Sequence, residues 1–485
     1  KIQKGWIEKV TADLVPYYFN TATGALQWEK PEELSGGNNA ATSGWVWLPD
    51  EEEGYMAAKP MGGKSYQLKD GRNTTYALPR GANPLAQLNI AVLSMLHSDL
   101  VLLDDLNEGL VLHNLRERYL KDEIYTGIGS ILIAINPFKR LPLYSPEAVT
   151  RYNKRGNKVL PPHPFDVADS CYKTILEIQT NQSILVSGES GAGKTETTKQ
   201  CLMFLAEVAG SESNIEQRVL SVNPILESFG NAKTLRNDNS SRFGRFSEII
   251  LSNDMKIAGA QIRSYLLEKS RVGYQQQGER NYHIFYQLCK SDWAQHYSLG
   301  GPEHYCYLAN SGCVDVPGMD DRVEFNDVIQ SMDSLGFTDA EKHSVFCIIA
   351  GIIQLGNVTF TSASINGADA STIDDAETAN LVASQFGVDA NQLHHALTHR
   401  TLEIIGQAPI KVPLRVEQAI ENRDALAKYV YGKLFLWLVD RINKSLAPQC
   451  ATHNFIGILD IFGFEIFKVN SFEQLCINFC NEKLQ

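Results

Sequence analysis

The sequence predicts an α/β protein whose mainly parallel central sheet is covered by helices on both sides. Three short apolar runs have the features of buried strands, being bounded by turn or polar residues: Ser130–Ile135, Ser183–Val186 and Asn454–Leu459. Long helical segments separate them, among them 341–355 and 423–444, and the second carries a leucine or valine every four residues. Buried strands that are joined by helices favour a parallel sheet with helices on both faces.

The length and composition are those of a globular protein with more than one core. A chain of 485 residues is too long for one ordinary core, and 44% hydrophobic with 21% charged residues is typical of globular proteins. The formal net charge of −12 excludes a generally basic surface, so we expect no nucleic-acid partner. Nine scattered cysteines form no CxxC pair, which favours reduced thiols in a cytosolic protein over a metal site. No signal peptide is visible, and no apolar run reaches the ~18 residues of a transmembrane segment.

Residues 1–34 predict a separate, very small sheet. Trp6 and Trp28 flank the aromatic run Tyr17–Phe19, and Pro31 follows the second tryptophan. Aromatic, β-favouring runs that are broken by turn residues indicate three short strands. A segment of this length buries little apolar surface, so a few large aromatic side chains must form its core.

This spacing resembles a WW domain. In that family the first tryptophan packs against the final proline, here Trp6 and Pro31. The second tryptophan and an early tyrosine, here Trp28 and Tyr17, form the groove for proline-rich peptides. Two positions depart from the usual histidine and the usual threonine or serine of the family: Thr21 and Leu26. The resemblance implies a proline-rich peptide partner, and an aromatic cluster without a ligand is the alternative.

The next segments predict a linker, a small subdomain and a large domain. Residues 35–44 are small and polar, which is typical of a flexible linker. Residues 45–80 contain short alternating stretches such as Trp45–Leu48 and Ser65–Leu68, so we expect a small β-barrel-like subdomain there. Helical and strand patterns alternate over residues 81–485, which predicts the main domain.

The strongest motif is a glycine-rich loop between the strand Ser183–Val186 and a helical segment, 195–208. Its backbone can curl so that N–H groups point inward, and the helix N-terminus adds partial positive charge. Lys194 can reach the β and γ phosphates of a nucleotide, and the Thr195 hydroxyl can bind Mg²⁺. The loop satisfies the P-loop pattern GxxxxGK[ST] and consists of Gly188, Glu189, Ser190, Gly191, Ala192, Gly193, Lys194 and Thr195. It predicts a site for a nucleoside triphosphate.

A second segment, 237–245, places two hydroxyls beside a guanidinium. Ser240 and Ser241 precede Arg242, and hydroxyl oxygens suit contacts to Mg²⁺ and to a γ-phosphate. A polar surface turn is the alternative for this segment taken by itself.

A third segment begins where the apolar run 454–459 ends. Asp460 would lie at the carboxyl end of a buried strand, where ligands bind in such sheets, and could hold Mg²⁺ through water. Gly463 follows and can offer an unobstructed backbone N–H. The alternative for Asp460 is a helix cap, which is weakened by the P-loop in the same chain.

Together the three segments resemble the P-loop, switch I and switch II of myosins. Kinesins continue switch I with Ser-His and have Ala-Gly-Ser-Glu in switch II, whereas this chain has Phe243-Gly244 and Phe462-Gly-Phe-Glu465. The resemblance covers about residues 45–485. Further stretches match the myosin pattern: Asn136–Arg140, Asn231–Thr234, Arg280–Phe285, Leu355–Asn357 and Asp424–Lys428.

The resemblance implies a role for each matching residue. The adenine would be bound by Asn136, Pro137 and Tyr144. The γ-phosphate region would be contacted by Asn237, Ser240 and the Gly463 N–H. Mg²⁺ would be ligated by Thr195 and Ser241, with Asp460 behind them. Arg242 and Glu465 would form a salt bridge that closes the site and orients the attacking water. The implied catalytic set is Lys194, Ser240, Arg242, Gly463 and Glu465.

The resemblance also implies an ATPase that moves on actin filaments in the cytoplasm. Switch II would pass its movement to a helix beginning near Asn470 and thereby to a lever, and light chains would bind only if a lever follows. The chain reaches Gln485, which is the start of that helix, so the lever is expected in further sequence. The loop 399–416 would face actin, and Ala408 stands where many myosins carry an acidic or phosphorylatable residue. The alternatives are a P-loop nucleotide switch without a track and a WW-led adaptor with an inactive motor half.

Overall fold

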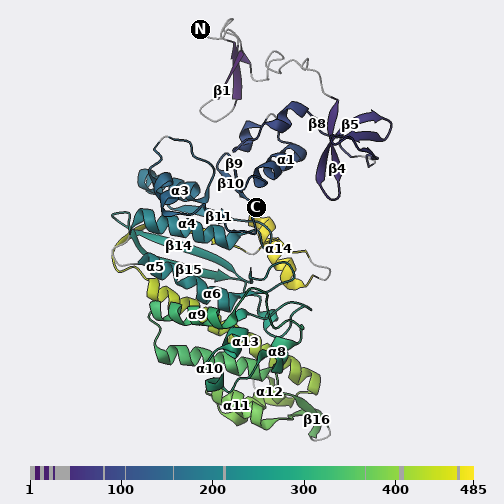
Figure 1. Cartoon of the computed structure of the whole chain (residues 1–485). Helices are drawn as coiled ribbons and strands as arrows, with labels where there is room; N and C mark the ends of the chain where they lie inside the picture. The colour runs from purple at the N-terminus through teal and green to yellow at the C-terminus, as the bar shows by residue number, and fades with distance from the viewer. Residues whose placement is uncertain are drawn as a thin grey trace. The chain divides into compact units, whose positions relative to one another are not determined.

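The computed structural model describes residues 6–10, 16–20, 26–27, 44–79, 82–103, 105–156, 158–210, 215–365, 368–402, 409–461, 463–466 and 470–484. The chain divides into two compact units, residues 1–133 and 134–485, which we describe separately (Figure 1). Ala408, the position compared with regulatory sites of myosins, lies outside the described residues.

A small antiparallel sheet opens the first unit. Its strands are β1 (Trp6–Val10), β2 (Pro16–Asn20) and β3 (Leu26–Gln27), and β2 lies in the middle. Three short strands were predicted here. The side chains of this segment, Tyr17 included, and all of residue Trp28 lie outside the described part of the chain, so the peptide groove stays a prediction.

A five-stranded antiparallel sheet follows in the first unit. Its order is β7-β6-β5-β4-β8, and β7 and β8 form its edges in the described pairings. The prediction of a barrel-like subdomain is therefore wrong for the described strands, because the two edge strands are too short to pair with each other along their length. The strands are β4 (Trp45–Asp50), β5 (Gly54–Gly62), β6 (Ser65–Leu68), β7 (Asn73–Thr75) and β8 (Gln87–Leu88).

Helix α1 (Glu108–Tyr119) packs on this sheet. Asn107 caps its N-terminus by accepting a hydrogen bond from the Leu110 N–H at 2.9 Å. The buried indole of Trp47 lies against Gly109, where an added Cβ would come within 2.4 Å of the ring. The 3₁₀ helices η1 (Ile90–Ser94) and η2 (Leu100–Leu102) precede α1.

The predicted strand at 130–135 differs from the expectation. It forms β10 (Ile131–Ala134), which pairs with β9 (Tyr125–Ile128) in a two-stranded sheet, and no described residue joins it to the larger sheet. Ile131 is 63% exposed, so the strand is not buried as its apolar sequence predicted.

The central sheet of the second unit has the order β11-β20-β14-β15. Its strands are β11 (Gln182–Val186), β20 (Thr452–Asp460), β14 (Gly244–Ser252) and β15 (Ile257–Tyr265). β11 and β20 are parallel, whereas β20–β14 and β14–β15 are antiparallel. The prediction of a mainly parallel sheet is wrong for these strands, because the four residues between β14 and β15 allow only an antiparallel hairpin.

Helices cover both sides of this sheet (Figure 1). α3 (Pro164–Ile178) and α4 (Lys194–Ala209) pack on β11 and β20, while α5 (Ile215–Leu220) and α13 (Val416–Leu446) pack on β15. The other elements before α13 are α2 (Pro146–Asn153), α6 (Val222–Gly230), β12 (Asn231–Ala232), β13 (Ser240–Ser241), η3 (Lys269–Val272), α7 (His283–Lys290), η4 (Ala294–Tyr297), η5 (Pro302–His304), α8 (Cys306–Ala309), α9 (Asp321–Ser334), α10 (Asp339–Leu355), β16 (Phe360–Ile365), β17 (Ala368–Ile373), α11 (Ala376–Phe386), α12 (Ala390–Thr398), β18 (His399–Leu402) and β19 (Ile410–Pro413).

The 31-residue helix α13 ties the helical region to the sheet. Tyr431 stacks on Tyr282 with 4.8 Å between ring centroids, and Phe435 meets Phe243, just before β14, at 5.0 Å. These aromatic contacts bury apolar area and fix the helix beside the segment that carries Ser240 and Arg242. Among the described residues no helix has both the length and the apolar character that a bilayer crossing requires.

Candidate functional site

The glycine-rich loop joins the end of β11 to the first residue of α4. Gly188, Gly191 and Gly193 have φ angles of 147°, 83° and 95°, a region that side chains other than glycine rarely adopt. Gly193 caps α4 without any side chain. The backbone N–H groups at this helix N-terminus are thus left open to an anion, as a phosphate site requires.

The side chain of Lys194 folds back into the loop. Its Nζ donates hydrogen bonds to the carbonyl oxygens of Gly188 and Glu189, at 3.0 and 2.8 Å. Burial lowers the pKa of Lys194, while the negative charges of Asp460 and Glu465 act in the opposite direction. The loop therefore holds an ammonium group at its centre, which suits a triphosphate.

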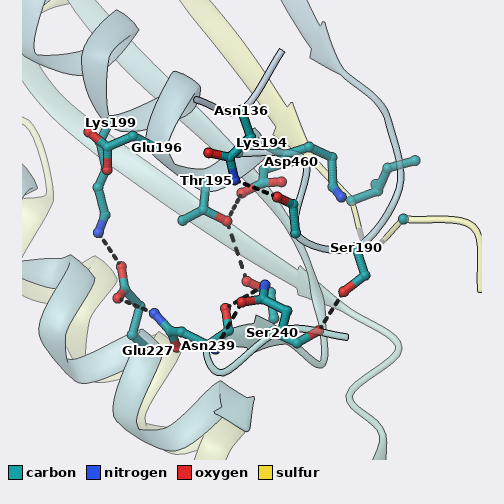
Figure 2. A pocket seen from close by; sticks show the side chains of 16 residues that line it. Asn136, Ser190, Lys194, Thr195, Glu196, Lys199, Glu227, Asn239, Ser240 and Asp460 are labelled. Carbon is teal, nitrogen blue, oxygen red and sulfur yellow. Dashed lines mark hydrogen bonds and ion pairs between the residues drawn. The ribbon is translucent and has the colours of Figure 1, made fainter. Parts of the chain in front are cut away.

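Two hydroxyls and a carboxylate meet beside the loop (Figure 2). The Thr195 hydroxyl donates to Asp460 Oδ2 at 3.0 Å and lies 3.4 Å from the Ser241 hydroxyl. Asp460 reaches this place because it ends β20, where it pairs in register with Val186 at the end of β11. Burial raises the pKa of Asp460, and the Thr195 hydrogen bond and the Lys194 charge oppose that rise. Oxygen donors from three segments fit the needs of Mg²⁺.

The segment 237–241 lies against the same loop. The hydroxyls of Ser190 and Ser240 are 3.1 Å apart, and Asn237 is the side chain nearest to the Cβ position of Gly191. From the other side Asn136 donates to the Gly191 carbonyl oxygen at 2.7 Å. These contacts bring together residues that are far apart in the sequence.

Arg242 and Glu465 form a fully buried pair. Arg242 Nη1 and Nη2 donate to the two carboxylate oxygens of Glu465 at 2.6 and 3.1 Å. Nη1 also donates to the Ser240 hydroxyl at 3.1 Å, which links the pair to the loop through Ser190. Two parallel bonds fix both distance and orientation, so this pair joins the second and third sequence segments rigidly.

Gly463 lies against the backbone of the glycine-rich loop. A Cβ added at Gly463 would come within 2.4 Å of backbone atoms of Gly188, Glu189 and Ser190. Any other residue would push the segment after β20 away from the loop. The close approach explains why glycine is needed at this position.

A cavity of about 210 Å³ opens between these segments. Eleven of the predicted residues line it: Asn136, Ser190, Gly191, Gly193, Lys194, Thr195, Asn237, Ser240, Ser241, Asp460 and Gly463. The other loop residues, Gly188, Glu189 and Ala192, are not part of the lining, and neither are Arg242 and Glu465. Pro137 and Tyr144 are not part of the lining, and Tyr144 packs instead on His163 and Phe165 with 5.6 and 6.2 Å between ring centroids.

The sequence interpretation missed one wall of the cavity. Lys199 forms an ion pair with Glu227 at 2.7 Å, and Asn239 donates to the same carboxylate at 3.2 Å (Figure 2). Glu196 and Ile461 complete the missed lining. The four-residue spacing from Thr195 could have placed Lys199 on the same face of α4. Glu227, on α6, carries no local signal.

The fold and the cavity define a class of protein. A strand, a glycine-rich loop and a helix surround a half-buried lysine, and hydroxyls and a carboxylate stand beside them. This is the arrangement of a P-loop nucleoside triphosphate site.

Comparison with known proteins narrows the class to a family. The model of the myosin head (motor domain) matches residues 97–485. The chain is 46% identical, over 91% of its length, to the high molecular weight form of myosin-1 of Acanthamoeba castellanii. It is 43% identical, over 91% of its length, to human unconventional myosin-Va, and 45% identical, over 80%, to myosin-1 of Emericella nidulans. The chain belongs to the myosin head family, which is a family of ATPases. It spans 29%, 24% and 32% of the length of these three relatives.

Proposed function

We propose that this chain binds ATP with Mg²⁺ and hydrolyses the γ-phosphate, as the nucleotide-binding part of an actin-based motor. The observation that carries the proposal is the bidentate salt bridge between Arg242 and Glu465. It joins the hydroxyl-bearing segment to the segment after β20, directly beside the P-loop. A site that only bound nucleotide would not need such a closure.

The positions of the residues support a role for each of them. The loop N–H groups and Lys194 would hold the phosphates, and Lys194 would exchange its two carbonyl partners for phosphate oxygens. Thr195 and Ser241 would ligate Mg²⁺, with Asp460 held to Thr195 behind them. The metal would neutralise charge on the phosphate oxygens. Asn136 stands at the loop on the side where the adenosine part would lie.

The chemical step needs positioning more than a strong base. Water attacks the γ-phosphorus, the bond to the β–γ bridging oxygen breaks, and ADP leaves with that electron pair. The proton of the water passes to a phosphate oxygen. Ser240 and the Gly463 N–H border the place where the γ-phosphate would lie, and the closed Arg242–Glu465 pair would keep other water out.

Replacing Glu465 tests this proposal. Glu465→Gln keeps the shape of the side chain but removes the charge that Arg242 holds. We expect ATP binding to stay within about threefold and single-turnover hydrolysis to fall by about 100-fold, the size of effect that follows loss of one group that orients the reaction. Glu482→Gln, at an exposed position of α14 (Phe472–Leu484), is the matched control. Hydrolysis at the wild-type rate in Glu465→Gln would contradict the proposed closure.

Exchanging the charges of Arg242 and Glu465 tests the proposed closure less sharply than Glu465→Gln does. Glu268 also accepts a hydrogen bond from Arg242, at 2.6 Å. A glutamate at position 242 would therefore face Glu268 as well as an arginine at position 465. We expect the double exchange, Arg242→Glu with Glu465→Arg, to restore only a small part of the activity.

Movement on actin is proposed for the intact protein. The support is the family membership of the chain together with the relatives named above. Actin filaments should raise the steady-state ATPase rate of the intact protein at least tenfold. A rate that does not respond to actin would favour a nucleotide switch without a track, and the absence of ATP binding would favour an adaptor with an inactive motor half. The same proposal assigns the protein to the actin cytoskeleton.

A further inference from the structure

We propose that Glu268 is a positioning residue for the proposed ATPase. It holds Arg242 in place whether or not Glu465 is bound, so that Arg242 is the fixed half of the closure and Glu465 the moving half. The inference rests on the proposed function. Glu268 lies between β15 and η3 and belongs to none of the motifs that the sequence singled out.

Two carboxylates hold Arg242 through different nitrogens of its guanidinium. Its Nη1 and Nη2 atoms face Glu465, whereas its Nε donates to Glu268 Oε2 at 2.6 Å. The guanidinium is wholly buried, and the Glu268 side chain is only 9% exposed. The backbone adds a further link, since the N–H of Glu268 donates to the carbonyl oxygen of Arg242 at 3.0 Å. Glu268 thus binds Nε, the one guanidinium nitrogen that does not donate to Glu465.

Glu268 is itself held by hydrogen bonds from neighbouring residues. Its Oε2 also accepts from Arg271 Nε at 2.7 Å, and Arg271 Nη1 donates to Glu279 at 2.9 Å. The Tyr282 hydroxyl donates to the Glu268 carbonyl oxygen at 2.7 Å. Burial opposes the ionised form of Glu268, but the two arginines hold its pKa at about 2. The carboxylate is therefore charged at every working pH and cannot turn away without breaking several bonds.

The charges of this cluster balance without Glu465. Arg242 and Arg271 carry two positive charges, and Glu268 and Glu279 carry two negative ones. When Glu465 leaves, Arg242 keeps a buried counter-ion, so the large cost of a stranded buried charge does not arise. Without Glu268, the same opening would leave Arg242 uncompensated. Glu268 therefore makes the closure reversible.

Glu465 is attached to a different element. Its N–H donates to Asn478 Oδ1 at 2.9 Å, and Asn478 Nδ2 donates to the Glu465 carbonyl oxygen at 2.7 Å. Asn478 lies on α14, so Glu465 moves with that helix. The two halves of the closure are thus held mainly by different supports: Arg242 by the network around Glu268, and Glu465 by α14.

Three variants in the intact protein test the inference. Glu268→Gln removes the charge, Glu268→Asp keeps it, and Glu248→Gln is the matched control. Glu248 is a carboxylate on β14 whose side chain is also 9% exposed, and it pairs with Arg263 at 3.3 Å. The measurements are the affinity for a fluorescent ATP analogue, the single-turnover hydrolysis rate and the melting temperature.

We expect Glu268→Gln to bind the analogue within about threefold of wild type and to hydrolyse ATP at least tenfold more slowly. Glu268→Asp should recover to within about threefold of the wild-type rate, and Glu248→Gln should keep that rate. Because both carboxylates act through Arg242, Glu268→Gln combined with Glu465→Gln should be no more than about threefold slower than the slower single variant.

Each other result overturns the inference. Hydrolysis by Glu268→Gln at the rate of Glu248→Gln, or effects that multiply in the double variant, would exclude action through Arg242. If Glu268→Asp is as slow as Glu268→Gln while both melt well below wild type, the role of Glu268 is only structural. A wild-type protein that does not hydrolyse ATP overturns the proposed function as well, so the two failures are distinguishable.

Discussion

Single residues decide whether the loop binds a triphosphate at all, and Lys194 is the first of them. Lys194→Ala removes the ammonium group that donates hydrogen bonds to two carbonyl oxygens of the loop. A charge-assisted hydrogen bond contributes about 1.5–3 kcal/mol, so we expect ATP affinity to fall by about 10- to 100-fold. Titration with a fluorescent ATP analogue measures the change. Lys444→Ala, an exposed lysine of α13, should bind as the wild type does.

The stability of the second unit, residues 134–485, should depend on the protonation of His163. This buried side chain caps α3, where its Nδ1 accepts from the Phe165 N–H at 3.1 Å, and it stacks on Tyr152 with 4.9 Å between ring centroids. Burial lowers the pKa of His163 to about 4, below its ordinary value of 6.5. The unfolded chain therefore binds the proton more readily, and stability is lost as the pH falls from 6.5 towards 4.

Between pH 6.5 and pH 5 the expected loss is about 2 kcal/mol. His163→Asn keeps a capping side chain but removes the titration, so its melting temperature should fall less over this range. His304→Asn, at a side chain that is 69% exposed, is the control and should follow the wild type. Equal pH slopes for all three proteins would refute the assignment.

The site residues that the sequence predicted lie in contiguous motifs, whereas those that it missed reach the site through the pairing of distant segments. Residues 188–195 are contiguous, and the pattern of glycines with Lys194 is itself the chemical requirement. Glu268 touches Arg242 only because β14 and β15 form a hairpin that returns the chain to it. Such contacts depend on strand pairing, which the local sequence does not encode.

Among the structural elements, α14 is the one tied to the closure. Its Asn478 holds the backbone of Glu465 by both the N–H and the carbonyl oxygen. We expect Asn478→Leu to break this link and to slow single-turnover hydrolysis about tenfold while ATP binding stays near wild type. Hydrogen exchange of α14 should respond to an ATP analogue in the wild-type protein and not in the variant. Glu482→Gln, on the same helix, should preserve that response.

The central sheet shows what periodicity can and cannot predict about elements. The apolar run before Asp460 was correctly predicted as a buried strand, because β20 lies inside the sheet with Ile456 and Ile458 fully buried. The equally apolar β11 is an edge strand among the described strands, and Leu185 is 51% exposed. An apolar run gives the type of an element, but its neighbours decide how far it is buried.

At the scale of the whole molecule, the first unit carries a separate prediction. If the strands β1, β2 and β3 form a WW-type sheet, Tyr17 and Trp28 bind a proline-rich peptide. We expect the intact protein to bind such a peptide with micromolar affinity in a fluorescence anisotropy titration, and Trp28→Ala to weaken binding at least tenfold. Trp45→Ala, in the five-stranded sheet, should leave the affinity unchanged. If the wild-type protein does not bind, the three strands serve as structure only.

The open edge of the central sheet should govern how this chain behaves in solution. In the described part of the chain β11 pairs only with β20, and beside its exposed Leu185 the helix α3 exposes Leu176 and Ile178. An apolar edge strand is a template for pairing with another chain, so we expect the 485-residue chain to self-associate at micromolar concentrations. Leu185→Lys should raise the monomer fraction several-fold in light scattering after gel filtration. Leu120→Lys, at a leucine of the first unit that is 69% exposed, should not change it. A wild-type chain that stays monomeric would mean that this edge is protected, and the prediction would fail.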